Sequence, residues 1–486
     1  MNNDQFVKVC LPVFLGLIVR SGILLYPHSG QSKPPIYGDY EAQRHWMEIT
    51  TNLPIHSWYV NSTENDLNYW GLDYPPLTAF HSWLMGKLSA WFNPQWTVLL
   101  ASHGVESYEH KVFMRYTVLL ADLLVFIPSV LLFFHRAIPR IVYNPKVSSF
   151  YACCLVLLYP GLVLIDHGHF QYNCISLGLF LAALDSFLLD CDILGTIFFC
   201  LALGYKQMEF YHALPLLFYL LGKCLRSSFH SGFITFLQLS FTVLFTSSVI
   251  FLPFLNSKET FFQVLHRIFP IARGLYEDKV ANFWCSTSPL IKWRQMFSQI
   301  ELIRLCSLFV LLSSLPCCLS LIVSPRKSKL LYSLAACSMN FFLFSYQVHE
   351  KSILLVAVSA LCLLPLSPIS SFLFALTSSL SMWPLLLKDG LALPCVCTVV
   401  LYILIGHAVV MRNSSESAKR YSWLTPNTLL IGLLTGFSLL FLAQAAVPSP
   451  SAYPDLFPLA ISIYSCGQFF AYLIFWNWQA FTGPMY

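Results

Sequence analysis

Residues 9–26 read VCLPVFLGLIVRSGILLY, and residues 38–50 read GDYEAQRHWMEIT. The first stretch is a long apolar run, whereas the second holds three carboxylates, an arginine and a histidine. Charged residues make up only 10% of the chain, so charge is concentrated in this second stretch. Membrane proteins that concentrate scarce charge in this way commonly carry chemistry there. The pair therefore predicts a membrane span followed by a functional segment, the alternative being a solvated amphipathic helix in a loop.

A second polar cluster, WGLDYPPLTA at residues 70–79, favours the functional interpretation. Two consecutive prolines end any helix and fix the direction of the chain. Asp73 comes shortly before these prolines, so we expect its carboxylate at a defined position rather than on a mobile face.

Composition predicts a polytopic membrane protein. Hydrophobic residues make up 57% of the chain and the mean hydropathy is +0.64, more than a soluble domain needs. We expect one integral membrane unit over residues 1–486, with large insertions at residues 28–111 and 255–300. The net charge of +5 is small and the basic residues are scattered, which gives no sign of nucleic-acid binding. The cysteines lie mostly in apolar runs without metal-ligand spacing, so neither a metal site nor a disulfide framework is expected.

Runs long enough to cross a bilayer, roughly 20 apolar residues each, predict an all-α protein with about fourteen spans. The shortest runs are expected to be broken or tilted. The expected spans cover residues 8–27, 112–134, 147–165, 172–189, 192–204, 208–222, 232–254, 301–323, 330–346, 352–365, 369–386, 391–410, 427–446 and 456–477.

The basic residues predict how these spans are oriented. They gather in one set of alternate loops, which the positive-inside rule assigns to the cytosol. These residues are Arg136, Arg140, Lys146, Lys223, Arg226, Arg326, Lys327, Lys329, Arg412, Lys419 and Arg420. The acidic clusters then face the opposite, lumenal side. Asn61 begins an Asn-Ser-Thr sequon on that side, where it can be glycosylated.

The polar segments together resemble a known enzyme family. GDYEAQRHWMEIT and WGLDYPPLTAFHS are similar to the endoplasmic-reticulum glucosyltransferases that use dolichyl-phosphate-glucose, closest to those that add the first glucose to Man9GlcNAc2 on dolichyl pyrophosphate. The similarity covers nearly the whole chain. It continues through DHGHFQYN (166–173), KQM (206–208), HRIFPIARGLYEDKVANFWC (266–285), FFLFSYQVHEK (341–351) and WPLLLKDGL (383–391).

The resemblance implies a GT-C glycosyltransferase fold and an inverting transfer that forms an α-1,3 linkage, in the endoplasmic reticulum membrane and on its lumenal face. It also implies that Asp39, the aspartate after the first span, is the catalytic base. We expect the other polar residues of these segments either to bind the acceptor or to serve as supporting groups of the site: Glu41, Arg44, His45, Asp73, Tyr74, Glu277 and Asp278.

The expected chemistry also assigns a role to the lumenal cations. Breaking the bond to a lipid phosphate leaves negative charge on the phosphate, which cationic donors stabilise. The candidate donors are Lys206, Arg267, Arg273, His349 and Lys351. Both substrates are lipid-linked, the donor being dolichyl-phosphate-glucose and the acceptor a dolichyl-pyrophosphate oligosaccharide. No cofactor is expected.

Some polar residues allow two interpretations. His167 and His169, beside Asp166, have the look of a metal site, although hydrogen bonds to sugar hydroxyls or capping of the spans is the favoured use. Asp122 is expected in a structural ion pair within the membrane, with Arg20 or Arg115 as alternative phosphate ligands. Residues 388–390, Lys-Asp-Gly, predict nothing on their own.

Two other functions stay open. An enzyme that adds the second glucose belongs to the same class, but its pattern is looser around the first motif. A lipid or sugar transporter would carry polar groups near the bilayer midplane in repeated halves. Here the polar clusters crowd one face and no repeat is visible, which favours chemistry at the membrane surface.

Overall fold

The computed structural model describes residues 3–270, 274–411 and 425–482. Within these residues all regular structure is helical, and the only β-type pairings are two isolated bridges, Ser62 with Asn65 and Tyr276 with Val348. The expected all-α membrane architecture is therefore confirmed.

The helices of the first half are α1 (Asn3–Ile23), α2 (Asp39–Asn52), α3 (Leu67–Trp70), α4 (Pro76–Phe92), α5 (Tyr108–Ala121), α6 (Ile127–Leu132), α7 (Ile138–Ile141), α8 (Ser149–Leu157), α9 (Pro160–Val163), α10 (Asn173–Leu188), α11 (Asp192–Tyr205), α12 (Phe210–Arg226) and α13 (Phe229–Phe251). Those of the second half are α14 (Lys258–Ile268), α15 (Phe283–Thr287), α16 (Trp293–Met296), α17 (Gln299–Val323), α18 (Lys327–Phe344), α19 (Ile353–Leu361), α20 (Pro368–Ser381), α21 (Trp383–Lys388), α22 (Ala392–Gly406), α24 (Pro426–Ala446) and α25 (Leu456–Thr482). Short 3-10 and π segments join several of them, including η5 (Leu164–Phe170) and η8 (Glu350–Ser352).

Each expected span falls on one or more of these helices. Among the described residues, 8 helical segments are long and apolar enough to cross a membrane by length and composition. They are Phe6–Ile23, Tyr108–Ile141, Ser149–Phe170, Phe229–Phe254, Gln299–Val323, Ala392–Met411, Pro426–Ala446 and Leu456–Thr482. Other expected spans fall on shorter apolar helices, such as α10, α11 and α20. The total of about fourteen stays a prediction.

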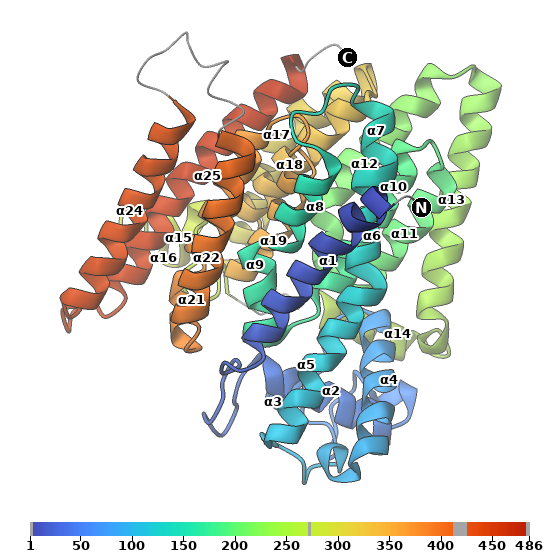
Figure 1. The fold of residues 1–486 in the computed structure, drawn as a ribbon. Helices are drawn as coiled ribbons and strands as arrows, with labels where there is room; N and C mark the ends of the chain where they lie inside the picture. The colour runs from blue at the N-terminus through green and yellow to red at the C-terminus, as the bar shows by residue number, and fades with distance from the viewer. Residues whose placement is uncertain (1–2, 271–273, 412–424, 483–486) are drawn as a thin grey trace.

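The helices form a bundle with a smaller helical layer at one end (Figure 1). Helices α2, α3 and α4 make up this layer, and α7 lies at the opposite end (Figure 1). Basic residues of two expected cytosolic loops meet on one acid, because Lys223 and Lys327 both form ion pairs with Asp190. The loops that the charge pattern groups on one side are thus brought together in the fold.

Helix α2 is buried although its sequence is polar. Every side chain from Tyr40 to Thr50 is buried, and the helix packs against α4. Asp39 and Glu41 lie in its first turn, where the helix dipole favours acidic groups. The alternative of a solvated loop helix is therefore wrong.

Charged residues in the first spans are paired, as expected. Arg20 Nε donates to Asp122 Oδ2 at 2.7 Å, and His167 Nε2 lies 2.6 Å from the same oxygen. Arg115 donates instead to the backbone carbonyls of Gly168 and Pro27. These contacts tie α1, α5 and η5 together and confirm the structural ion pair predicted for Asp122.

Candidate active site

A cavity of about 790 Å³ lies where α2 and α3 meet the ends of the bundle helices. Its walls come from segments far apart in the chain, including the start of α2, the turn after η5, the turn between α11 and α12, and the end of α21. Most of the residues predicted for the site lie on this wall. These are Asp39, Asp73, Tyr74, Lys206, Arg267, Glu277, Asp278, His349 and Lys351.

Asp39 opens α2 at the edge of the cavity. Gly38 allows this position, because a Cβ at Gly38 would lie 2.5 Å from Ser29 Oγ, which accepts a hydrogen bond from the backbone N–H of Asp39. Lys351 Nζ donates to Asp39 Oδ2 at 2.7 Å, and Gln171 Nε2 donates to the same oxygen. These contacts leave Oδ1 without a hydrogen-bond partner among the described residues.

Asp39 is held as a carboxylate. Burial raises its pKa, but the positive charge of Lys351, together with contacts from Lys351 and His169, outweighs burial and holds the pKa well below 3.8. His169 Nε2 lies 3.1 Å from Asp39 Oδ2. A carboxylate fixed on one oxygen by cationic and amide donors can receive a proton on its other oxygen.

Lys206 lies in the turn after α11 and is almost fully buried on the cavity wall. Its Nζ donates to Asn173 Oδ1 and lies 5.2 Å from the centre of the Tyr74 ring. Burial lowers the pKa of Lys206 to about 8, since Asp166 only partly offsets the cost of a desolvated ammonium.

The remaining expected cations are engaged with protein groups. Arg267 donates to the backbone carbonyls of Gly71 and Leu72, which fastens the segment that carries Asp73. His349 Nε2 lies 3.1 Å from Glu277 Oε2. Arg273 lies outside the described residues, and its role stays a prediction.

Residues 274–278 lie along one side of the cavity and are held there by backbone contacts. Tyr276 and Val348 form an isolated parallel bridge, and the N–H of Gln347 donates to Leu275 O. This pairing brings Glu277 and Asp278 to the wall, and Asp278 faces Lys388 at 3.7 Å.

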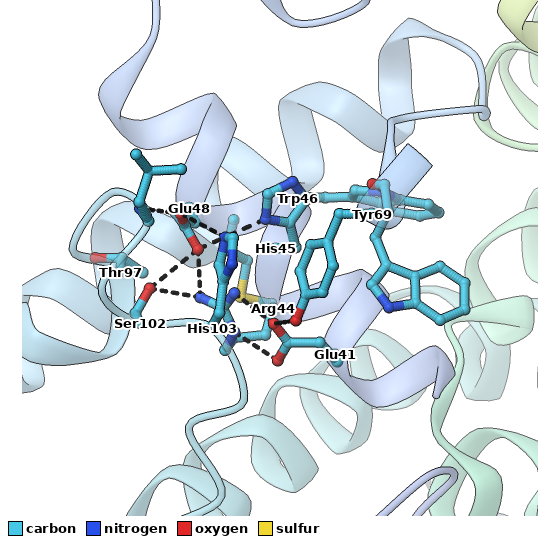
Figure 2. Close-up of polar contacts among 12 residues, drawn as sticks. Glu41, Arg44, His45, Trp46, Glu48, Tyr69, Thr97, Ser102 and His103 are labelled. Carbon is cyan, nitrogen blue, oxygen red and sulfur yellow. Dashed lines mark hydrogen bonds and ion pairs between the residues drawn. The ribbon is translucent and has the colours of Figure 1, made fainter. Parts of the chain in front are cut away.

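Glu41, Arg44 and His45 do not line the cavity. Arg44 forms a two-point ion pair with Glu41 at 2.6 and 2.7 Å and a further one with Glu48 at 2.7 Å (Figure 2). The side chains of Glu41, Arg44 and Glu48 are at most 2% exposed. Of the two expected uses, a supporting role fits this placement better than binding of the acceptor, because none of the three side chains lines the cavity.

One group among the described residues has the spacing of a metal site, formed by His45, Glu48 and His103. Its carboxylate is already occupied, because Glu48 accepts hydrogen bonds from the N–H of Leu100 and the hydroxyl of Ser102 as well as the Arg44 ion pair (Figure 2). A cation would have to share Glu48 with the guanidinium at 2.7 Å, so we interpret this group as a structural network.

Asp166, His167 and His169, the candidate ligands of the second possible metal site, do not converge on one point either. Asp166 accepts hydrogen bonds from Asn173 and the N–H of Cys174, while His167 contacts Asp122. The three candidate ligands therefore serve separate partners, and the metal interpretation of this motif is not supported. Arg20 and Arg115 are likewise absent from the cavity wall.

The sequence interpretation missed Gln171 and Asp389 as parts of the site. Gln171 contacts Asp39, and Asp389 Oδ2 lies 2.5 Å from Nδ1 of His169. Nothing local in the Lys-Asp-Gly sequence at 388–390 signals this contact, because its partner is 220 positions away. Asn61 is exposed and does not itself line the cavity.

Comparison with known proteins identifies the family. The family model described as "ALG6, ALG8 glycosyltransferase family" matches residues 6–476. The chain belongs to this glycosyltransferase family. Its relatives include "Dolichyl pyrophosphate Man9GlcNAc2 alpha-1,3-glucosyltransferase" of Gallus gallus, 46% identical over 98% of this chain and 96% of that protein. The Mus musculus protein of the same name is 44% identical over the same shares of the two chains.

A third relative is the Drosophila melanogaster protein named "Probable dolichyl pyrophosphate Man9GlcNAc2 alpha-1,3-glucosyltransferase", 43% identical over 98% of this chain and 99% of that one. Among solved structures, ArnT from Cupriavidus metallidurans bound to undecaprenyl phosphate has a TM-score of 0.41 and 13% identity, over 98% of this chain and 77% of that chain. This likeness is too distant to inform the site. The family membership confirms the resemblance seen in the sequence.

Proposed function

We propose that the protein transfers glucose from dolichyl-phosphate-glucose to the Man9GlcNAc2 arm of the dolichyl-pyrophosphate-linked oligosaccharide, as the first glucose of N-glycan precursor assembly. The linkage is α-1,3 and the transfer inverts the anomeric centre. The reaction takes place at the lumenal face of the endoplasmic reticulum membrane. The observation that carries the proposal is Asp39, a carboxylate with one oxygen held by Lys351 and Gln171 on the wall of a cation-rich cavity, in a family whose relatives bear this enzyme's name.

In this proposal Asp39 is the general base. The acceptor hydroxyl attacks the anomeric carbon of glucose and loses its proton to the carboxylate as the new C–O bond forms. The bond from the anomeric carbon to the phosphate oxygen breaks, and its electron pair stays on the phosphate. The transition state has oxocarbenium character, as in other glycosyl transfers. Phosphate is already a competent leaving group, so the proposal needs no acid, metal or cofactor.

The cations then have one shared task, which is to stabilise the charge that develops on the departing phosphate. Lys206 is the leading candidate, because it is nearly buried on the wall and an ammonium in a dry site interacts strongly with an anion. Arg267, His349 and Lys351 are on the same wall, and Arg273 stays a candidate. Asp73, Tyr74, Glu277 and Asp278 are proposed to orient the acceptor.

The test compares wild type with Asp39→Asn in an assay with purified dolichyl-phosphate-glucose and Man9GlcNAc2 lipid. The amide keeps the size of the side chain but cannot take a proton, so we expect activity to fall about 10²- to 10⁴-fold. Donor binding, measured separately, should persist. Full activity of the variant would move the base to Asp73, Glu277 or Asp278.

The same assay decides between family members. The family model spans two groups of enzymes, and the names of the relatives favour transfer to Man9GlcNAc2. Transfer by the wild type only to a monoglucosylated acceptor would make it the second-glucose enzyme. Transfer to neither acceptor would overturn the proposal and favour a transporter.

A further inference from the structure

Three distant segments meet at His169, which lies in η5 and is 2% exposed. On one side, Nδ1 of the ring lies 2.5 Å from Oδ2 of Asp389, at the end of α21. On the other side, Nε2 lies 3.1 Å from Oδ2 of Asp39 and 3.1 Å from Nζ of Lys351. Both ring nitrogens are therefore in polar contacts: Nδ1 contacts Asp389, and Nε2 contacts the proposed base, Asp39, and Lys351.

The backbone fixes where Asp389 can reach. Its N–H donates to Leu385 O, and the next residue, Gly390, adopts the left-handed conformation with φ of +74°. The N–H groups of Gly390 and Leu391 then turn back to the carbonyls of Leu387 and Leu386. This is a helix end closed by a left-handed glycine, which leaves Asp389 little freedom.

The contact also fixes the histidine. An ionised carboxylate only accepts hydrogen bonds, so Asp389 requires a proton on Nδ1 of His169. Nε2 then accepts from Lys351 when the ring is neutral and donates to Asp39 when it is charged. In either state Nε2 stays in contact with both Lys351 and Oδ2 of Asp39.

We propose that Asp389 is a positioning residue of the active site, which acts through His169 to hold the carboxylate of Asp39 with Oδ1 directed to the acceptor. The inference rests on the proposed function, in which Asp39 is the base. It extends the site to a residue of the C-terminal half that touches no reacting atom. Small displacements of a reacting group can cost about 10²-fold in rate, which is the size of the expected effect.

The experiment is a double-mutant cycle on the purified full-length protein, with Asp389→Asn, His169→Gln and both together. We expect Asp389→Asn to lower kcat about 10²-fold with little change in KM for either lipid. In the His169→Gln background, Asp389→Asn should cause no further loss. Asp455→Asn is the matched control, because it removes an exposed acid from an ion pair with Lys279 that is not on the cavity wall.

The possible outcomes separate the two proposals. A wild type without glucose transfer overturns the proposed function and this inference with it. An active wild type with a fully active Asp389→Asn overturns this inference alone, and so does an equal loss in both backgrounds, which would show a structural role independent of His169. If Asp389→Asn does not fold, Asp389→Glu keeps the charge but moves it by about one C–C bond, ~1.5 Å, and must still lower kcat at unchanged KM.

Discussion

Asp39 and Lys206 show how neighbours set the charge of the site. Asp39 keeps its charge in spite of burial, because Lys351 and His169 are in direct contact with its carboxylate. Lys206 has an amide oxygen and an aromatic ring as its close partners, and burial brings its pKa down to about 8. Asp39, the proposed base, therefore stays ionised near neutral pH, whereas the charge of Lys206 is sensitive to mildly alkaline pH.

This difference predicts a pH profile. Because Lys206 is charged below its pKa, kcat/KM for the donor should fall as pH rises through about 8. A bound phosphate stabilises the ammonium, so kcat should fall only at higher pH. Lys206→Arg keeps its charge at every accessible pH, and its activity, although reduced by the altered geometry, should stay level up to pH ~9. The measurement is kcat/KM from pH ~6 to ~9 for both proteins, and identical profiles would remove Lys206 from the phosphate-binding set.

At the scale of the element, α2 has two working faces. Asp39, Gln43 and Trp46 recur at helical spacing and line the cavity. Glu41, Arg44 and Glu48 lie on another face and form the buried ion-pair network. The helix thus presents one face to the cavity, while the charged contacts of its other face fix its rotation.

We expect the buried ion-pair network to stabilise the layer formed by α2, α3 and α4. Burial would raise the pKa of Glu48, but His45 at 3.6 Å and the charge of Arg44 lower it to about 2. This contribution to stability is present above the ordinary glutamate pKa of 4.5 and is lost as pH falls from 4.5 toward 2. Glu48→Gln leaves Arg44 with one charged partner and should cost about 3–5 kcal/mol.

The check is the thermal unfolding of detergent-purified wild type and Glu48→Gln at pH ~7 and ~4. The variant should unfold at a lower temperature than the wild type. The difference between their two unfolding temperatures should be smaller at pH ~4 than at pH ~7. Asp455→Asn is again the control variant. It removes an ion pair with Lys279 whose acid is exposed, so its unfolding temperature should stay close to that of the wild type. A variant as stable as the wild type would mean that the network does not hold α2.

Across the whole molecule, the features that could be predicted from the sequence are those with a local signal. Hydropathy located the long apolar helices. The polar motifs pointed to Asp39 and to other residues of the wall, because both signals are local in the chain. Helical spacing in the motif at residues 38–50 also predicts two faces, one with Asp39 and Gln43 and another with Glu41 and Arg44. An interpretation based on charge density alone does not separate these faces.

Other features needed the three-dimensional fold. Asp389 is 220 positions from His169, and no spacing rule connects a residue of η5 with the end of α21. The pairing of Gln347 with Leu275 is likewise a meeting of separate loops. Such contacts depend on how the bundle is packed, which one sequence does not specify by pattern.

Orientation in the membrane has a simple test. Asn61 is exposed, and its side-chain oxygen accepts the N–H of Leu67. If the layer of α2 to α4 is lumenal, Asn61 carries a glycan. Treatment with an endoglycosidase should then increase the electrophoretic mobility of the wild type and leave Asn61→Gln unchanged. An unmodified wild type, in cells that glycosylate a lumenal control protein, would argue against this orientation.

The pairing of Arg20 with Asp122 also bears on the order of synthesis. The two residues are 102 positions apart, so α1 leaves the ribosome well before its acidic partner. An unpaired arginine within a lipid-embedded helix costs about 2.5–3.5 kcal/mol at the helix centre. Arg20 also donates to the carbonyl of Leu157, which is made later still. The first helix therefore cannot reach its final packing when it is inserted, and assembly of the N-terminal bundle has to follow the translation of α8.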